Sequence, residues 1–267
     1  MAVVDNRLAE HPVAVHYDIV GEGPPLVLQH GRLGSGHSWT EAGYVEALAG
    51  DRTLILVDAR GHGRSDKPHA AEAYGPRDMA SDVIAVLDDL GVDRTDFLGY
   101  SMGGRIGFAA LAHFGDRFNS MLAGGAGPYG PARSAEAEIE TADSLAGGME
   151  AYLAAMERML DIRMPDALRE ARLANDADAL AALARRTATW TPVVDEVAAS
   201  GVPLLLFGGT EDPIWELIER AAGELPTAEL VAVGPFGHGE DLRRPDLVLP
   251  LVSDFLGRVG LAADRRA

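Results

Sequence analysis

Residues 99–104 read Gly99-Tyr100-Ser101-Met102-Gly103-Gly104, so a single serine lies in a turn rich in glycine. The preceding residues 95–98 end in Phe and Leu and indicate a short buried strand, and residues 105–111 carry apolar side chains at helical spacing. A serine on a turn between a strand and a helix is typical of a nucleophile elbow. The glycines suit this turn because the serine backbone is strained and a neighbouring side chain would collide with the helix. The segment therefore predicts Ser101 as a nucleophile.

Two loops further along the chain carry the partners that a serine nucleophile needs. An apolar run at 202–207 leads into Gly208-Gly209-Thr210-Glu211-Asp212-Pro213, and a second at 228–233 leads into Gly234-Pro235-Phe236-Gly237-His238-Gly239. Open α/β sheets bind ligands at the carboxyl ends of their strands, which is where both loops are predicted to lie. We therefore expect Asp212 and His238 to meet Ser101, with Glu211, Asp195 and Asp241 as alternative acids.

The order of nucleophile, acid and base is the one found in α/β-hydrolases, and the chain resembles the serine-nucleophile members of that fold family. Two more segments carry the resemblance. Leu26-Val27-Leu28-Gln29-His30-Gly31 is similar to the family's strand and His-Gly turn, and Asp58-Ala59-Arg60-Gly61-His62-Gly63-Arg64-Ser65 is similar to its D-x-R-G-x-G-x-S turn. With the elbow and the acid and base loops, the resemblance covers residues 12–128 and 198–258.

The fold that the resemblance implies is α/β: a mostly parallel central sheet flanked by helices, with a helical cap inserted between the sixth and seventh core strands. Strands and helices alternate as such a sheet requires. Strands are predicted at 13–20, 25–29, 53–57 and 121–123, and helices at 39–48, 78–90 and 246–259. The segment 129–197 breaks the alternation, because most of it is rich in helix-forming residues with helical periodicity. We assign 1–128 and 198–267 to the hydrolase core and 129–197 to the cap.

One face of the predicted cap carries several large apolar side chains at helical spacing. We expect them to pack together, with some of them lining the mouth of a substrate pocket. They are Met149, Tyr152, Met156, Met159 and Leu160.

The resemblance implies a catalytic triad and an oxyanion hole. Ser101 would attack the substrate, His238 would take its proton and return it to the leaving group, and Asp212 would orient the imidazole. The backbone N–H groups of Arg32 and Met102 would hold the oxyanion, where the loss of one donor costs about 3 kcal/mol of barrier.

Arg32 departs from the family pattern, in which the residue after the His-Gly pair is often apolar or aromatic. Its guanidinium is a candidate for pairing with a substrate carboxylate or a polar acyl group. The alternatives are that it points to solvent or forms an ion pair with an acid of the cap. Tyr100, next to Ser101, is the other candidate substrate-binding residue.

The composition is that of a soluble enzyme. The chain has 267 residues, of which 47% are hydrophobic, and this suits one domain with an inserted subdomain. No apolar run approaches the roughly 18 residues of a membrane span, and the first residues include Asp5 and Glu10 and lack the apolar core of a secretion signal. The absence of cysteine excludes disulfides, zinc–thiolate sites and a cysteine nucleophile. We therefore expect a cytoplasmic protein.

The net charge of −18 argues against nucleic acid and anionic membranes as partners, because both require a basic surface. We expect a small-molecule substrate, no cofactor and no metal, since no pair of the eight histidines has metal-ligand spacing on a helix with a nearby acid. His30 and His62 are predicted to hold loops rather than to transfer protons. The sequence does not indicate the oligomeric state.

The reaction predicted first is hydrolysis of a small-molecule carboxylic ester, lactone or thioester through an acyl-enzyme. The same triad serves carbon–carbon bond hydrolysis and perhydrolase or haloperoxidase-type chemistry, and both remain alternatives. The first of these usually has tryptophan after the base, where this chain has Gly239, and Arg32 suits the second poorly. Epoxide and haloalkane hydrolysis require an aspartate at position 101 and are excluded. A receptor-like binding protein with slow turnover is less favoured, because nothing in the sequence points to a partner surface.

Overall fold

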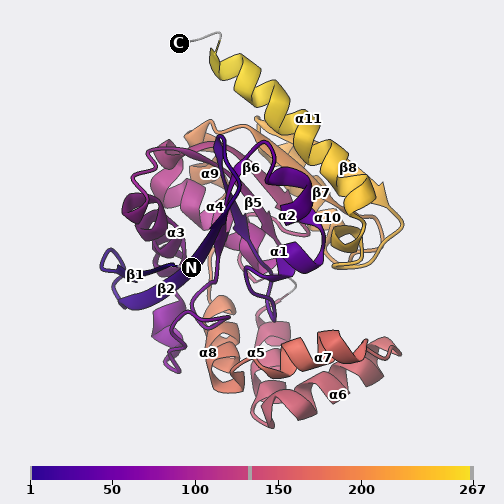
Figure 1. Ribbon diagram of the computed structural model, residues 1–267. Coiled ribbons are helices and arrows are strands. Elements are labelled where there is room, and N and C mark those ends of the chain that lie inside the picture. Colours follow the sequence, from indigo (N-terminus) through magenta and orange to yellow (C-terminus); the bar gives the residue numbers. More distant parts are fainter. Residues whose placement is uncertain (1, 132–133, 265–267) are drawn as a thin grey trace.

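The computed structural model describes residues 2–131 and 134–264, and its centre is an eight-stranded sheet (Figure 1). The strand order is β1-β2-β4-β3-β5-β6-β7-β8. The β1–β2 and β2–β4 pairs are antiparallel, and the remaining pairs are parallel. The strands are β1 Ala2–Asn6, β2 Val13–Val20, β3 Pro25–Gln29, β4 Thr53–Val57, β5 Thr95–Tyr100, β6 Phe118–Gly124, β7 Leu204–Gly209 and β8 Ala228–Gly234.

Helices cover both faces of the sheet, and each face has its own apolar cluster. One cluster includes side chains from α3 Pro76–Asp89, α4 Met102–Phe114, α9 Val194–Ser200 and α10 Trp215–Glu224. The other includes side chains from α1 Ser38–Glu41, α2 Tyr44–Leu48 and α11 Pro245–Asp264. The parallel strands therefore lie between two layers of helices, and the chemistry-bearing loops lie at one edge of this sandwich.

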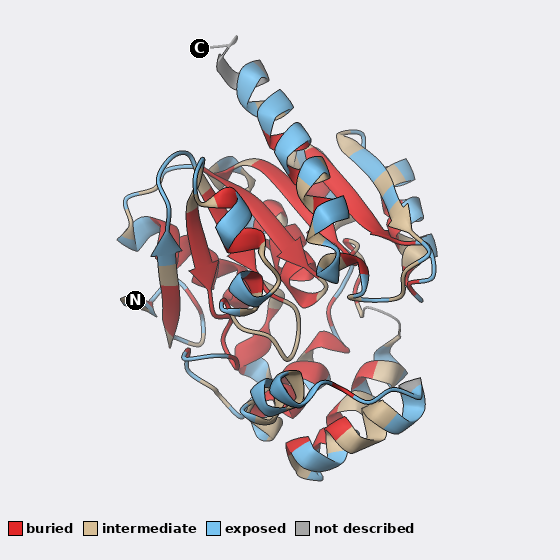
Figure 2. Ribbon diagram, turned by 45° about the vertical axis from the view of Figure 1, so that its right-hand side comes forward, coloured by how far each residue is buried: buried red, intermediate tan, exposed pale blue. Residues whose placement is uncertain are grey.

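The strands divide the core because successive side chains of a strand point to opposite faces. In β4, Ile55 and Val57 belong to one cluster, and Leu54 and Leu56 belong to the other. Figure 2 shows the result: the central strands are buried, while the outward sides of the helices are exposed. Among the described residues, no helix is long and apolar enough to cross a membrane.

Within the described residues between β6 and β7 there are five helices, and four of them project from one end of the core (Figure 1). These four, called the helical insertion below, are α5 Ala135–Leu145, α6 Gly148–Leu160, α7 Asp166–Leu173 and α8 Ala177–Thr187. α5 packs along α8, and α8 lies against the short 3-10 turn Ala71–Tyr74 of the core. The indole N–H of Trp190 donates a hydrogen bond to the Tyr74 carbonyl (3.1 Å), which anchors the end of the insertion.

The observed elements differ from the predicted ones in several places. β6 is longer than the strand predicted at 121–123, and α11 continues beyond the helix predicted at 246–259 to Asp264. The helix predicted at 39–48 is divided into α1 and α2 by Gly43, whose φ of 82° is left-handed and cannot continue a right-handed helix. The strand β1, which the sequence analysis did not predict, pairs with β2 at the edge of the sheet. β1 ends in two polar residues, Asp5 and Asn6, and its Val3 is exposed, so the segment lacks the apolar run that indicated the other strands.

The predicted apolar face of the insertion is only partly present. Met149 is buried, and Tyr152 and Met156 pack against the core cluster as half-buried side chains. Met159 is 70% exposed, so its inclusion was wrong, and the Leu160 side chain lies outside the described residues. α6 continues for about one turn beyond Met156, the last of these residues that packs against the core cluster. Helical periodicity does not show at which turn the packing ends.

Candidate active site

The turn around Ser101 joins the end of β5 to the start of α4. Ser101 has φ 54° and ψ −116°, a conformation that is strained for a residue with a side chain. A Cβ on Gly99 would meet the backbone of Gly103, and one on Gly103 would collide with the backbone carbonyl of Gln29. Glycine is therefore required at both positions by the close approach of helix, strand and turn, and the strained turn raises Ser101 above the edge of the sheet.

Ser101, His238 and Asp212 form a continuous hydrogen-bonded chain. Nε2 of His238 lies 2.8 Å from Oγ of Ser101, and Nδ1 of His238 lies 2.6 Å from Oδ2 of Asp212. Because a carboxylate only accepts, Nδ1 carries the proton that it shares with Asp212, and Nε2 is then free to accept the proton of the serine. The structure thus brings together all three residues of the predicted triad, across 137 positions between Ser101 and His238.

The side chains of Asp212 and His238 differ in solvent exposure. The Asp212 side chain is 1% exposed and its other carboxylate oxygen accepts the backbone N–H of Ile214 at 3.0 Å. The His238 side chain is 41% exposed, so the imidazole is accessible from solvent. Of the alternative acids, Glu211 is exposed and Asp195 lies in the first turn of α9, while Asp241 bonds to Tyr100 instead of His238. Asp212 is therefore the acid that holds the imidazole.

Tyr100, a candidate substrate contact in the sequence, has a side chain that is 3% exposed. Its hydroxyl donates a hydrogen bond to Oδ1 of Asp241 and accepts one from the backbone N–H of Gly239 at 2.7 Å. The ring lies 5.5 Å from the His238 ring, centroid to centroid. Tyr100 is thus placed behind the imidazole, with its hydroxyl fully occupied, and it holds the loop that carries His238.

The loop after β3 lies directly against the elbow. A Cβ built on Gly31 would be 3.3 Å from the Tyr100 carbonyl oxygen and 3.4 Å from Cβ of Ser101. Arg32 follows at once, and Met102, the first residue of α4, lies on the other side of Ser101. The N–H groups in the first turn of a helix have no acceptor inside the helix. This arrangement suits the predicted oxyanion donors, the backbone N–H groups of Arg32 and Met102.

Two buried histidines support that loop, as the sequence analysis expected. The ring of His30 bonds to the Gly31 carbonyl and accepts the backbone N–H of Ala59 at 3.1 Å, and the His62 ring lies 5.1 Å from it. Burial lowers the pKa of His30, and burial together with His30 lowers the pKa of His62 to about 3. Both rings are therefore neutral supports at physiological pH.

The Arg32 side chain takes one of the alternative positions open to it. Its guanidinium forms an ion pair with Glu138 of α5, with Nη2 and Oε2 2.6 Å apart. Glu138 is 5% exposed and also pairs with Arg105 of α4 at 3.3 Å. Burial alone would raise the pKa of Glu138, but the charges of Arg32 and Arg105 hold it below its ordinary value. One buried carboxylate of the insertion therefore binds two guanidinium groups of the core.

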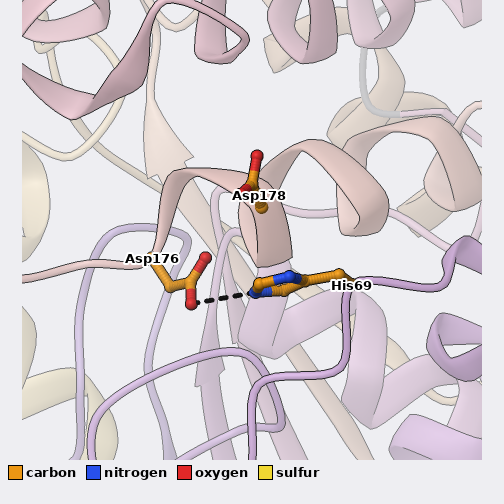
Figure 3. Close-up of side chains that lie close together, drawn as sticks. All are labelled: His69, Asp176 and Asp178. Carbon is orange, nitrogen blue, oxygen red and sulfur yellow. Dashed lines mark hydrogen bonds and ion pairs between the residues drawn. The ribbon is translucent and has the colours of Figure 1, made fainter.

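One group of potential metal ligands lies away from the triad, among the residues that the structure describes (Figure 3). It consists of His69, Asp176 and Asp178 at the start of α8. Nε2 of His69 pairs with Oδ2 of Asp176 at 3.0 Å, and the other oxygen of Asp176 caps α8 by accepting the N–H of Ala179. The positive end of the helix dipole disfavours a cation at this point. The ion pair and the cap account for the positions of His69 and Asp176, and Asp178 adds a second negative charge near the His69 ring.

Comparison with known proteins agrees with this geometry. A family model described as the alpha/beta hydrolase fold matches residues 24–161. The chain belongs to the α/β-hydrolase family. It is 30% identical to the putative carbamate hydrolase RutD of Pseudomonas savastanoi pv. phaseolicola, over 88% of this chain and 94% of that protein.

Two other similar proteins cover nearly the whole of this α/β-hydrolase. A putative 2-succinyl-6-hydroxy-2,4-cyclohexadiene-1-carboxylate synthase of Bacillus subtilis is 28% identical over 91% of this chain and 95% of its own length. The crystal structure of a hydrolase from Pseudomonas aeruginosa PA01 has a TM-score of 0.83 at 24% identity, covering 96% of this chain and 98% of that one. The family match and the similarity to the carbamate hydrolase together show a hydrolase of this fold.

Two features of this α/β-hydrolase site were not predicted. Glu138 lies in a segment with many glutamates, and no local pattern distinguishes it from its exposed neighbours Glu136 and Glu140. Asp241 was considered only as an alternative acid, although it lies three residues after His238. The pattern of residues around Asp241 could not reveal its hydrogen bond to Tyr100, because that bond joins residues that are distant in the chain.

Proposed function

We propose that this α/β-hydrolase is a serine hydrolase that acts on a small-molecule carboxylic ester, lactone or thioester. The hydrogen-bonded chain of Ser101, His238 and Asp212 carries the proposal. A serine hydroxyl is a weak nucleophile and needs a base within hydrogen-bond reach, and that base needs a group that fixes its orientation. The 2.8 Å and 2.6 Å contacts meet both requirements.

The proposed reaction proceeds through an acyl-enzyme. Oγ of Ser101 forms a bond to the carbonyl carbon while its proton passes to Nε2 of His238, and Asp212 stabilises the resulting imidazolium. The backbone N–H groups of Arg32 and Met102 hold the oxyanion. As the carbonyl reforms, the ester C–O bond breaks and the alcohol takes the proton from His238. Water then repeats the attack with His238 as base, which releases the acid and restores Ser101.

The helical insertion is proposed to be the cap of this site, within the predicted division into cap 129–197 and core 1–128 and 198–267. α9, which crosses the boundary at 197, packs against α4 of the core. Two contacts support a position beside the oxyanion loop. Arg32 pairs with Glu138, and the amide of Asn175 donates a hydrogen bond to the carbonyl of Leu33 at 3.2 Å. A substrate that reaches Ser101 would thus be held between the insertion and the core.

The test is hydrolysis of p-nitrophenyl esters of graded acyl length by the wild type and by Ser101→Ala. We expect the wild type to release nitrophenolate and the variant to lose this activity, with the preferred length measuring the acyl site. Glu211→Gln serves as a control beside the acid, because its side chain is exposed and should leave the rate near that of the wild type. Activity that survives in Ser101→Ala would overturn the proposal.

If the wild type does not hydrolyse these esters, reaction with a fluorophosphonate probe tests whether Ser101 is nucleophilic. Labelling at Ser101 would indicate a working nucleophile and favour carbon–carbon bond hydrolysis or perhydrolysis over ester hydrolysis. A wild type that neither hydrolyses the esters nor reacts with the probe would favour the receptor-like alternative.

A further inference from the structure

The loop after β3 has a strained backbone at Leu33. Three residues other than glycine have a positive φ in the described part of the chain, and two of them, Leu33 with φ 68° and Ser101 with φ 54°, belong to this site. A leucine in the left-handed region is costly, and it persists only where its surroundings hold it. Residues 31–34, called the oxyanion loop, therefore need contacts that keep them in this conformation.

Contacts inside the loop set the direction of one backbone N–H. The Gly31 carbonyl accepts hydrogen bonds from the backbone N–H of Gly34 at 3.1 Å and from Nδ1 of the neutral His30 ring at 2.8 Å. In a trans peptide the carbonyl and the N–H of the same peptide group point in opposite directions, and the described residues contain no cis peptide bond. The two bonds to the Gly31 carbonyl therefore also orient the N–H of Arg32, the proposed oxyanion donor.

Two contacts from the helical insertion hold the next two residues of the loop. The guanidinium of Arg32 pairs with the buried carboxylate of Glu138 in α5, with Nη2 and Oε2 2.6 Å apart. The carbonyl of Leu33 accepts a hydrogen bond from the side-chain amide of Asn175, between α7 and α8, at 3.2 Å. The strained part of the loop is thus bonded to the insertion at two consecutive residues.

Glu138 is also bonded to the core helix on the other side of Ser101. Its second oxygen, Oε1, lies 3.3 Å from Nη1 of Arg105 in α4. The Arg105 guanidinium is itself held, because Nη2 donates a hydrogen bond to the Gly130 carbonyl at 2.8 Å. One carboxylate of the insertion therefore connects the loop that contains Arg32 to the helix that begins at Met102, and these are the residues of the two proposed oxyanion donors.

We propose that Glu138 and Asn175 are positioning residues that hold the oxyanion loop, so that the helical insertion contributes to stabilisation of the oxyanion. The inference rests on the proposed function, because the N–H that it concerns is the proposed donor of Arg32. Neither side chain touches the reacting atoms, and both act through Arg32 and Leu33. Oxyanion donors lower the barrier because they are fixed in advance where the charge develops. A loop released from these contacts would relax from its strained conformation and lose that advantage.

The experiment removes each contact separately. Glu138→Gln keeps the size of the side chain and removes its charge, and Asn175→Ala removes the amide. The kcat for a p-nitrophenyl ester is expressed per site labelled by a fluorophosphonate, so that only folded, reactive molecules are counted. We expect kcat to fall about tenfold in Glu138→Gln, a part of the roughly 10²–10³-fold loss that removal of a whole donor causes. Asn175→Ala should show a smaller fall, and KM should change little in both variants because the donors act in the transition state.

Inhibition by a trifluoromethyl ketone provides a readout that a merely structural role would not move. Such a ketone forms an adduct with the serine whose oxyanion occupies the same hole as that of the transition state. Transition-state analogues follow the stabilisation of the transition state. The inhibition constant should therefore rise in each variant by about the factor by which kcat/KM falls.

The same helix offers a matched control. Glu140 of α5 is exposed, so Glu140→Gln removes the same charge away from the loop and should behave as the wild type in both measurements. Urea unfolding checks that the variants fold. If Glu138→Gln does not fold, Asn175→Ala decides, because this side chain is half-buried and uncharged. Wild-type kcat in the folded variants, a lower kcat with unchanged inhibition by the ketone, or an equal loss in Glu140→Gln would overturn the proposal.

Hydrogen exchange separates this inference from the proposed function. A wild type without esterase activity would count against ester hydrolysis alone, because exchange of the Gly34 N–H reports on the loop without any reaction. That N–H is bonded to the Gly31 carbonyl and should exchange faster in Glu138→Gln and Asn175→Ala than in the wild type and Glu140→Gln. Faster exchange in both variants would support the positioning role, and unchanged exchange would overturn it.

Discussion

The hydroxyl of Tyr100 donates a hydrogen bond to Oδ1 of Asp241, with an O···O distance of 2.5 Å, although the two residues are 141 positions apart in the chain. The residue before Ser101 is thus bonded to the loop that carries His238. Burial raises the pKa of Asp241, and the hydroxyl of Tyr100 opposes that shift. The bond joins two segments of the site behind the imidazole, close to the 2.8 Å contact between His238 and Ser101 through which the proposed proton transfer would pass.

Tyr100→Phe is expected to reduce both stability and kcat. The change leaves the carboxylate of Asp241 and the N–H of Gly239 without their shared partner, and a buried group in this state costs about 1–3 kcal/mol. Urea unfolding and ester kinetics measure the two effects. Tyr129→Phe is the control, because its hydroxyl bonds to the exposed Glu224 and should contribute little. Similar losses in both variants would contradict a special role for Tyr100.

Asp212→Asn is expected to lower kcat by about 10⁴-fold with little change in fold, as in other triads where the acid sets the imidazole tautomer. The amide preserves the size of the buried side chain but can donate an N–H to Nδ1 of His238. The ring proton would then be on Nε2, which could no longer accept the proton of Ser101. Ester kinetics and circular dichroism together check this result. A variant that keeps a tenth or more of the wild-type rate would assign the orienting role to another group.

Gly103→Ala is expected to be strongly destabilising, by more than about 4 kcal/mol, because its Cβ would collide with backbone that cannot move away. Gly257→Ala is the matched control in α11, where a Cβ meets nothing within 4 Å. That substitution should stabilise the helix by about 0.5–1 kcal/mol. Thermal or urea unfolding measures the change in the free energy of unfolding for each variant. Equal changes in the two variants would show that the close approach of the backbone of Gln29 does not require glycine at position 103.

The free energy of unfolding should fall as the pH falls from about 6.5 toward 3. The folded protein holds His62 at a pKa of about 3, against an ordinary value of 6.5, so in this interval the unfolded chain binds a proton that the folded one excludes. The loss is about 1.4 kcal/mol per pH unit for this ring, and His30, whose pKa is also lowered, adds to it. Above pH 6.5 the contribution is fully present.

Urea unfolding at several pH values measures this loss, and NMR observes the two rings directly. The ring signals of His30 and His62 should remain those of neutral imidazoles from pH 8 to pH 5. Signals that titrate within this interval would show that the rings are hydrated and that the turn at residues 58–65 opens.

Much of the fold could be predicted because its signals are local. The strands at 13–20, 25–29 and 53–57 have the predicted bounds, since each is a short apolar or alternating run that ends at glycine, proline or a charged residue. The division of the helix at 39–48 was missed, because an isolated glycine is tolerated in a helix and only the backbone shows that Gly43 is left-handed. The extent of the apolar face on α6 was likewise decided by contacts with the core.

By itself, the sequence determined the family and predicted the glycine-rich turn at Ser101 and the loops that carry Asp212 and His238, because glycine spacing and strand ends are properties of neighbouring residues. Only the tertiary structure decided that Glu138 is the partner of Arg32 and that Tyr100 lies behind His238. These contacts join residues far apart in the chain. The strength of such contacts depends on the distance between the side chains and on their burial, and the order of residues along the chain gives neither quantity.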